Sequence, residues 1–364
     1  MSNAFWDRLV PRRPTRPPRP PTPPIEPTEP TRPQTAARIF PVTDAVDGDF
    51  VNRMYPYWSN ACLIDGQAYI FAGTTDDRPK FFRVNLDNGE VTRLGALLPY
   101  TGTGEGWSWD INGRIYLGDG PFLRRVNPIS GQDDVIFSVQ DRFPGHRLWQ
   151  IHVSRDGQMQ SATLQRVTSE GAYPNVGTVV HHSATGQLDY FPALGKLDES
   201  SISKNGRWVF IQEDNNDRII DLTMDPVQER IVYDAERAVA HCDMGPDYAI
   251  GEADKPDPGA CVKMDLATLE ITILYLTNNM GHVSVQNGKC LLTDVMNLSL
   301  LPMDGSGPIT LAQHGMVVPP NATQEEAYNH QCMANLDPTA TVAAYVTNRG
   351  GRGRFDVDLL VLPQ

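Results

Sequence analysis

The segment WSNACLIDGQAYIFAG, residues 58–73, contains one copy of the repeating unit that decides the fold. It predicts an apolar strand, a two-residue turn at Asp65-Gly66 and a second apolar strand. Asp-Gly is favoured in tight hairpins because both central positions of such a turn need a positive φ angle. The segment therefore predicts a β-hairpin, and similar hairpins recur to the end of the chain.

The hairpin turns recur at intervals of 41 to 50 residues. This is the period of a four-stranded propeller blade. A second turn follows inside most units, as in LDNGEV at 86–91, so each unit supplies four strands. We therefore predict an all-β fold, a seven-bladed β-propeller over residues 37–364. The turns that set the period are Asp65-Gly66, Asn112-Gly113, Asp156-Gly157, Asn205-Gly206, Pro246-Asp247, Asn287-Gly288 and Asp337-Pro338.

The seventh unit is one strand short, because the chain stops after VAAYVTNRGGRGRFDVDLLVLPQ. The segment ARIFPVTD, residues 37–44, precedes the first blade and has no partner of its own. We predict that it supplies the missing outer strand of blade seven, which closes the ring and leaves no open edge at the junction. The alternative is a β-sandwich or two smaller domains, but no linker-like composition occurs between residues 45 and 364.

Residues 1–36 form a different region, an apolar docking peptide followed by a proline-rich arm. Residues 11–33 contain 11 prolines in 23 positions, which excludes both helix and sheet and predicts an extended spacer. We expect the apolar tip to anchor the chain to protein partners in a larger assembly; the alternative is a disordered tail. The anchoring residues would be Phe5, Trp6, Leu9 and Val10.

The net charge of -13 restricts the partners of the body. The arm has six Arg against one Asp and two Glu, a balance of +3, so the body carries about -16. Because phosphate binding needs clustered Lys and Arg, we expect no nucleic-acid partner. No run of 18 apolar residues and no signal-peptide pattern occurs, so we expect neither membrane insertion nor classical secretion.

The five cysteines are scattered and include no CxxC pair, which predicts neither a disulfide framework nor a zinc site. We expect buried free thiols, with Cys62 and Cys332 as the pair to watch because both fall on inner strands of neighbouring blades.

Histidines begin the inner strands of the last three units. In a propeller these strands line the central channel, so His241, His282 and His330 are expected near one mouth of it. Imidazoles that converge can bind a transition metal or act as a general base. The alternative is that these polar residues simply bind one another and trapped water.

The runs AHCD at 240–243, GHVS at 281–284 and NHQCMANLDPTATVAAYVTNRGG at 329–351 resemble the last three blades of the oligogalacturonate lyase family. Members of that family are seven-bladed propellers that cleave pectic fragments by β-elimination. The resemblance implies that His241 is the catalytic base, and that His282 and His330, with Asn329, hold a divalent metal such as manganese. That family has one Gln and two His where this chain has only His330 between two amides.

Aromatic and basic residues offer a second kind of site at the same mouth. Trp58, Trp107 and Trp149 begin the inner strands of the first three units, and aromatic faces stack on sugar rings. Arg349 and Arg352, in the loop TNRGGRGR, would bind a carboxylate or sulfate on an acidic glycan. The alternative is that the tryptophans pack between blades and the loops are only solvated.

Three functions are compatible with these features. The first is a non-enzymatic propeller, anchored by its arm to a virion-like particle or surface appendage and presenting a loop face to a ligand or glycan, with no cofactor. This organisation is similar to that of bacteriophage virion appendages and would place the protein on the particle surface. The second is a metal-assisted polysaccharide lyase with His241, His282 and His330 in the roles above. The third is a scaffold for a protein partner.

Overall fold

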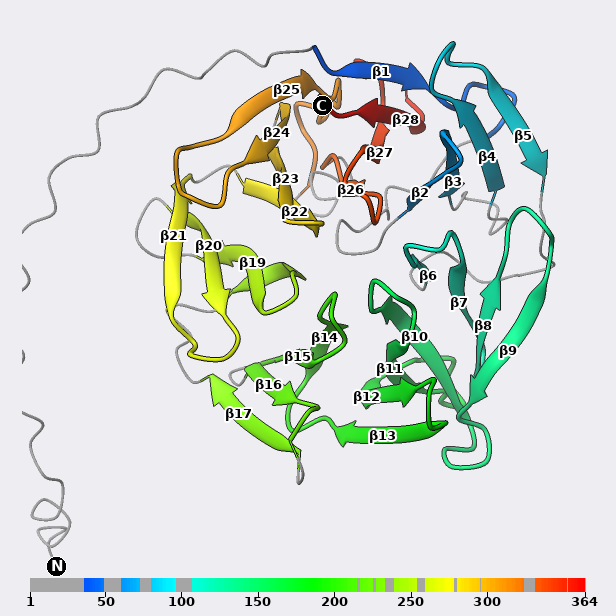
Figure 1. Ribbon diagram of the computed structural model, residues 1–364, viewed down its shortest axis with the longest axis vertical. Helices are drawn as coiled ribbons and strands as arrows, with labels where there is room; N and C mark the ends of the chain where they lie inside the picture. Colours follow the sequence, from blue (N-terminus) through cyan, green and yellow to red (C-terminus); the bar gives the residue numbers. More distant parts are fainter. Residues whose placement is uncertain are drawn as a thin grey trace, which may run out of the picture.

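The computed structural model is an all-β, seven-bladed β-propeller, as predicted (Figure 1). Seven four-stranded antiparallel sheets surround a central axis, and the described residues contain no helix. Accordingly, no helix in this part of the chain has the length and hydrophobicity of a membrane span. The residues described are 36–48, 60–72, 80–95, 107–214, 217–224, 227–232, 239–253, 259–277, 280–294, 296–323, 331–351 and 353–363.

Each of the first six blades uses four consecutive strands, from the channel outward. Blade 1 contains β2 (Ala61–Ile64), β3 (Gln67–Ala72), β4 (Lys80–Asn85) and β5 (Val91–Gly95). Blade 2 contains β6 (Trp107–Trp109), β7 (Ile115–Asp119), β8 (Phe122–Val126) and β9 (Asp133–Ser138). Blade 3 contains β10 (His146–Val153), β11 (Met159–Arg166), β12 (Asn175–His182) and β13 (Gln187–Pro192).

The remaining blades complete the ring. Blade 4 contains β14 (Leu197–Ile202), β15 (Trp208–Glu213), β16 (Asp217–Asp221) and β17 (Gln228–Val232). Blade 5 contains β18 (Ala240–Met244), β19 (Tyr248–Ala253), β20 (Ala260–Asp265) and β21 (Ile271–Leu276). Blade 6 contains β22 (Met280–Gln286), β23 (Lys289–Asp294), β24 (Asn297–Leu301) and β25 (Ile309–Gln313). Blade 7 contains β26 (Ala334–Leu336), β27 (Val342–Thr347), β28 (Asp356–Val361) and β1 (Arg38–Pro41).

The Asp-Gly and Asn-Gly turns between first and second strands are of two kinds. At Asp65-Gly66 and Asn287-Gly288 both residues have positive φ, as expected for a two-residue hairpin. In blades 2, 3 and 4 only the glycine does, and the loop is longer. In blade 2 the side chain of Asp110 accepts hydrogen bonds from the backbone N–H groups of Asn112 and Arg114 instead. The same sequence signal thus marks two turn geometries.

Neighbouring blades are joined at this turn end of their inner strands by backbone hydrogen bonds. The N–H of Ile111 donates to the carbonyl of Arg155 (2.8 Å), that of Arg155 to Lys204 (2.8 Å), and that of Lys204 to Gly245 (3.1 Å). This series links blades 2 to 5 and satisfies polar groups that would otherwise lie unpaired between sheets.

The hydrophobic core is divided among the blade interfaces. Six clusters of buried side chains occur among the described residues, and each draws its members from adjacent sheets. Between blades 1 and 2, for example, the ring of Phe71 packs edge-on against Trp107 at 4.8 Å. Burial of the sheet faces therefore drives the association of one blade with the next.

The ring is closed by the N-terminal strand, as predicted. β1 pairs antiparallel with β28, from Arg38 opposite Val361 to Pro41 opposite Asp358. Figure 1 shows this strand on the outside of blade 7, next to the C-terminus. Two chain ends that are more than 300 residues apart thus share one sheet.

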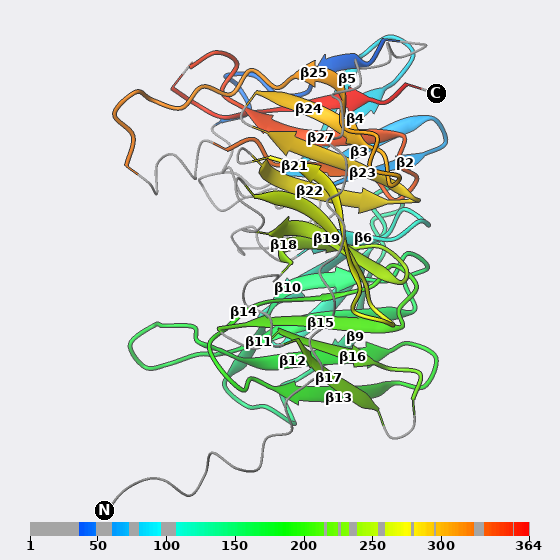
Figure 2. The same ribbon diagram turned by 90° about the vertical axis from the view of Figure 1, so that its left-hand side faces the viewer.

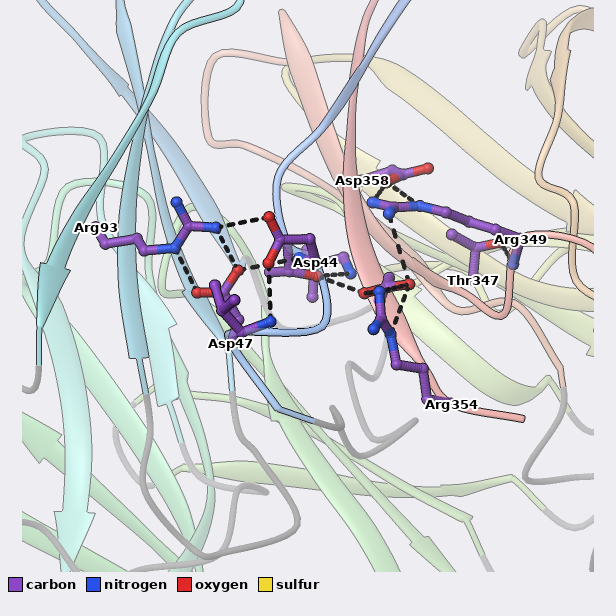
Figure 3. Close-up of polar contacts among 11 residues, drawn as sticks. Asp44, Asp47, Arg93, Thr347, Arg349, Arg354 and Asp358 are labelled. Carbon is purple, nitrogen blue, oxygen red and sulfur yellow. Dashed lines mark hydrogen bonds and ion pairs between the residues drawn. The ribbon is translucent and has the colours of Figure 1, made fainter. Parts of the chain in front are cut away.

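The segment that follows β1 is clamped to two blades (Figure 3). Toward blade 7, Thr43 accepts a hydrogen bond from the Val357 N–H and donates one to Asp356. Toward blade 1, Arg93 donates to both carboxylate oxygens of Asp47, at 2.6 and 2.8 Å. Burial disfavours the charge on Asp47, but hydrogen bonds from Arg93 and the Asp44–Asp47 turn hold its pKa below the usual value.

All five cysteines are free and buried, as expected, including Cys62 and Cys332. Burial raises the pKa of every one of these thiols. The proposed anchoring residues Phe5, Trp6, Leu9 and Val10 lie outside the described residues, so their role stays a prediction.

Candidate functional site

We call the face that carries the starts of the inner strands the mouth face. The loops between the second and third strands of the blades open onto the same face. Figure 2 shows loops 167–174, 314–323 and 347–351 projecting from it on the left of the view. The predicted catalytic, metal and ligand-binding residues that the structure describes lie on the first strands of the blades or in these loops, which makes the geometry of this face the basis for any functional argument.

The inner strands of four consecutive blades are irregular near the mouth. The pairing of each with its neighbour shifts register by a β-bulge, whereas the inner strands β2, β6 and β26 pair regularly. Bulges redirect side chains and are frequent next to active sites. Two bulged residues, Gln150 and His241, have left-handed backbones with φ of 48° and 45°. The bulges lie at Trp149–His152, Leu197–Glu199, Ala240–Asp243 and Met280–His282.

The structure brings together two of the predicted histidines. The rings of His241 and His282 lie with their centroids 5.6 Å apart and nearly perpendicular. His282 is buried, and this burial, followed by the proximity of His241, lowers its pKa to about 3. His282 is therefore a neutral imidazole at physiological pH, the form that binds metals.

The histidine pair is compatible with part of a metal site. The Nδ1 atom of His241 is buried and accepts or donates no hydrogen bond within the described part of the chain. This nitrogen belongs to the predicted catalytic base and lies beside His282, a predicted metal ligand. Of the predicted metal ligands, only His282 is described, because His330 and Asn329 lie outside the described residues; among those that are described no group of three or more candidate ligands occurs.

Carboxylates lie close to the same strand. Burial and then Glu199, Asp217 and Asp243 raise the pKa of the Cys242 thiol, the residue next to His241. Burial also raises the pKa of Asp217 to about 6, although a hydrogen bond from the backbone of Glu213 partly opposes this shift. A carboxyl group that titrates near neutral pH can serve as a general acid or base. Sequence patterns gave no signal for Asp217, because its pKa depends on burial.

A second polar group lies deeper, where three blades meet. The buried carboxylate of Asp243 accepts hydrogen bonds from the Lys204 ammonium (3.0 Å), the Val285 N–H (2.6 Å) and the Met244 N–H (2.8 Å). Burial raises the pKa of Asp243, whereas Lys204 lowers it. This group connects blades 4, 5 and 6, so we regard it as structural.

The predicted tryptophans have different environments. Trp107 is buried, packs between blades 1 and 2, and donates its indole N–H to Asn60. Trp149 is only partly buried, and the guanidinium of Arg147 lies 5.1 Å from its ring centroid. Trp58 lies outside the described residues. Of the tryptophans that can be placed, Trp149 is thus the one with a surface that a ligand can reach.

Of the two predicted ligand-binding arginines, the structure describes Arg349. The guanidinium of Arg349 forms ion pairs with Asp358 (2.5 Å) and Asp356 (3.5 Å), and Arg354 pairs with Asp356 as well (3.1 Å) (Figure 3). Arg349 thus neutralises carboxylates of β28 within its own blade. Arg352 lies outside the described residues.

Comparison with solved structures supports the fold assignment. A structure of oligogalacturonate lyase in complex with manganese matches with a TM-score of 0.65 at 13% identity, covering 92% of this chain and 96% of that one. RRP9 WD40 repeats match at 0.55 and 10% identity, covering 92% and 100%. A chain of a mitotic checkpoint complex matches at 0.53 and 12% identity, covering 98% and 100%.

At these identities the similarity establishes the propeller fold alone. No protein-family model matches the sequence, and no curated protein is significantly similar to it. The resemblance to oligogalacturonate lyases seen in the last three blades is accompanied by a similar overall fold.

Proposed function

We propose that this protein is a non-enzymatic binding module, which residues 1–36 anchor to a larger assembly such as a virion-like particle or surface appendage, and which presents the mouth face to a glycan. The observation that carries this proposal is that residues 38–48, which we call the root of the arm, are bound to two blades. Residues 38–48 are fixed to blade 7 by β1 and to blade 1 by Asp47. An attachment point of this kind supports a rigid domain on a tether.

The contacts of the root would resist a mechanical force applied to the arm. β1 contributes a strand of blade 7, and the Arg93–Asp47 pair, with a Lys80 hydrogen bond to the Asp47 carbonyl, connects it to blade 1. Force on the arm would therefore act across the junction where the ring closes. This is a suitable place for a tether, because both chain ends are already paired there.

Two shortened chains test the anchoring proposal. Deletion of residues 1–36 leaves β1 in place, and we expect an unchanged unfolding midpoint but no incorporation into the assembly. Deletion of residues 1–48 also removes β1 and the clamp, and we expect it to destabilise blade 7. Thermal unfolding and co-sedimentation with the particle measure the two effects. Normal incorporation without residues 1–36 would contradict the proposal.

A second candidate function is a metal-assisted polysaccharide lyase, which the adjacency of His241 and His282 favours. A divalent ion bound by His282, His330 and Asn329 would neutralise the carboxylate of a uronate substrate. His241 would accept the proton α to that carboxylate. The buried Nδ1 of His241 has no hydrogen-bond partner among the described residues, as a residue awaiting a ligand would have.

Metal content separates the second function from the first. We expect His282→Ala to lose a bound divalent ion under the lyase hypothesis, and His146→Ala, on a half-exposed side chain outside the histidine pair, to retain it. Elemental analysis gives this result independently of turnover, and ultraviolet absorbance of the unsaturated product then reports β-elimination. A protein that contains no metal after purification with manganese would exclude the lyase.

A further inference from the structure

Blade 3 carries an arginine that is held between two aromatic rings on the mouth face. The guanidinium of Arg147 lies 3.6 Å from the ring centroid of Tyr173 and 5.1 Å from that of Trp149. Tyr173 is 44% exposed, whereas Arg147 and Trp149 are partly buried. Cation–π contact of this kind orients the guanidinium plane and leaves an aromatic surface open to solvent. We call these three residues the blade 3 cluster.

The blade 3 cluster is held in place by a series of amide hydrogen bonds. Arg147 Nε donates to Gln165 Oε1 (2.7 Å), and Gln165 Nε2 donates to Asn175 Oδ1 (2.8 Å). Asn175 Nδ2 in turn donates to the carbonyl of Leu197 in blade 4 (2.9 Å). The arginine is thus oriented before any ligand arrives, which reduces the entropy lost on binding.

The loop that carries Tyr173 is also ordered. β10, β11 and β12 have eight residues each, which makes them the longest described strands of the molecule. The loop between β11 and β12 is closed by a hydrogen bond from the Thr168 N–H to the Ala172 carbonyl (3.0 Å) and is tied to Gly145 through Val167 (2.9 Å). Figure 2 shows this green loop extending from the mouth face.

We infer that the blade 3 cluster is a subsite for an acidic sugar residue of the glycan, an assignment that rests on the proposed glycan-binding function. Aromatic rings stack on the apolar face of a pyranose, and an arginine beside them binds a carboxylate with its planar fork. The amide of Gln165 and the two ring faces position the guanidinium of Arg147 beside the exposed ring of Tyr173. The cluster adds two residues, Arg147 and Tyr173, to the predicted Trp149.

The test compares a uronic acid oligosaccharide with the same oligosaccharide after its carboxyl groups are reduced to alcohols. We expect the full chain to bind the acidic form at least tenfold more tightly in isothermal titration calorimetry, as one charged hydrogen-bond pair provides. Arg147→Gln should remove this preference for the acidic form, and Tyr173→Ala should weaken the binding of both forms about tenfold. Arg142→Gln is the matched control, because Arg142 stacks on a single ring, Phe143, in the same blade.

The outcomes separate this inference from the proposed function. If the unaltered chain binds neither oligosaccharide, glycan binding itself fails and the subsite fails with it. If it binds the acidic form and Arg147→Gln and Tyr173→Ala bind equally well, the subsite is refuted while the proposed function stands. Circular dichroism and the unfolding midpoint establish that each variant is folded, and Tyr173→Phe, which keeps the ring, should retain binding.

Discussion

The two ends of the inner strands differ in regularity. At the turn end, backbone hydrogen bonds link blades 2 to 5 in an uninterrupted series through Arg155 and Lys204. At the mouth end, blades 3 to 6 carry bulges, and Gln150 and His241 adopt strained backbones. Strain persists where the surrounding structure holds it, and it tends to accumulate at functional sites. The comparison shows that the turn end holds neighbouring blades together by regular hydrogen bonds, whereas the mouth end carries the irregular strands on which we propose a binding face.

We expect the largest loss of stability when the ion pair between Lys204 and Asp243, near the turn end, is removed. Lys204→Met leaves the carboxylate of Asp243 buried without its cation, so we expect a loss of about 3 kcal/mol in the free energy of unfolding. Urea titration measures this loss. The double variant with Asp243→Asn should recover part of the stability, and a single variant as stable as the parent would show that this group does not hold the blades together.

The turn of blade 7 provides a second test of the same end. Asp337 is fully buried, and its carboxylate accepts hydrogen bonds from Thr339, Thr341 and Val342. Asp337→Ala leaves these N–H groups unpaired, and we expect a loss of about 2 kcal/mol with ligand binding unchanged. Asp304→Ala, in an exposed outer hairpin, is the control and should unfold like the parent. If Asp337→Ala lost ligand binding and kept its stability, the turn end would not have the stabilising role that we assign to it.

The mouth end should respond to pH through His314. Nδ1 of this buried histidine accepts a hydrogen bond from the Met316 N–H, and Nε2 donates to the Asp294 carbonyl, which fixes the neutral ring. Burial lowers its pKa from 6.5. Below pH 6.5 the unfolded chain therefore binds more protons than the folded one. The contribution of neutral His314 to the free energy of unfolding is thus complete above pH 6.5 and is lost as pH falls.

The corresponding measurement is the free energy of unfolding at pH 7 and pH 5. The parent should lose up to about 1.4 kcal/mol per pH unit more than His314→Gln, which cannot titrate. Asp217, whose pKa is raised to about 6, acts in the opposite direction in both proteins and cancels in the comparison. Equal losses in parent and variant would show that His314 does not contribute.

We expect the smallest change in stability from relief of backbone strain at the mouth end. His241→Gly relieves a positive φ that an L-residue tolerates poorly, and we expect it to raise the free energy of unfolding by about 0.5 kcal/mol. Any function of the histidine pair should be lost at the same time. His181→Gly, in the regularly paired part of β12, is the control and should be destabilised. A less stable His241→Gly protein would mean that the bulge is held by the imidazole itself.

Much of the fold was predictable from local chemistry. The turn residues and their period located seven blades, and the unpaired strand at residues 37–44 located the closure. The site was less predictable. The sequence placed His241 and His282 at one mouth, but Trp107, chosen by the same reasoning, is buried between blades. Position along an inner strand does not determine whether a side chain faces the channel or the next sheet.

The sequence by itself determined the number of blades, their order and the strand that closes the ring, because turn conformation and strand alternation depend on residues close together in the chain. Only the tertiary structure decided which side chains form sites. Arg349 finds carboxylates nine residues or fewer away, whereas Arg147 contacts one ring on its own strand, Trp149, and one in a loop of the same blade, Tyr173. Bulges, burial and the surroundings of each side chain depend on how strands and blades pack together, and this packing exists only in the folded molecule.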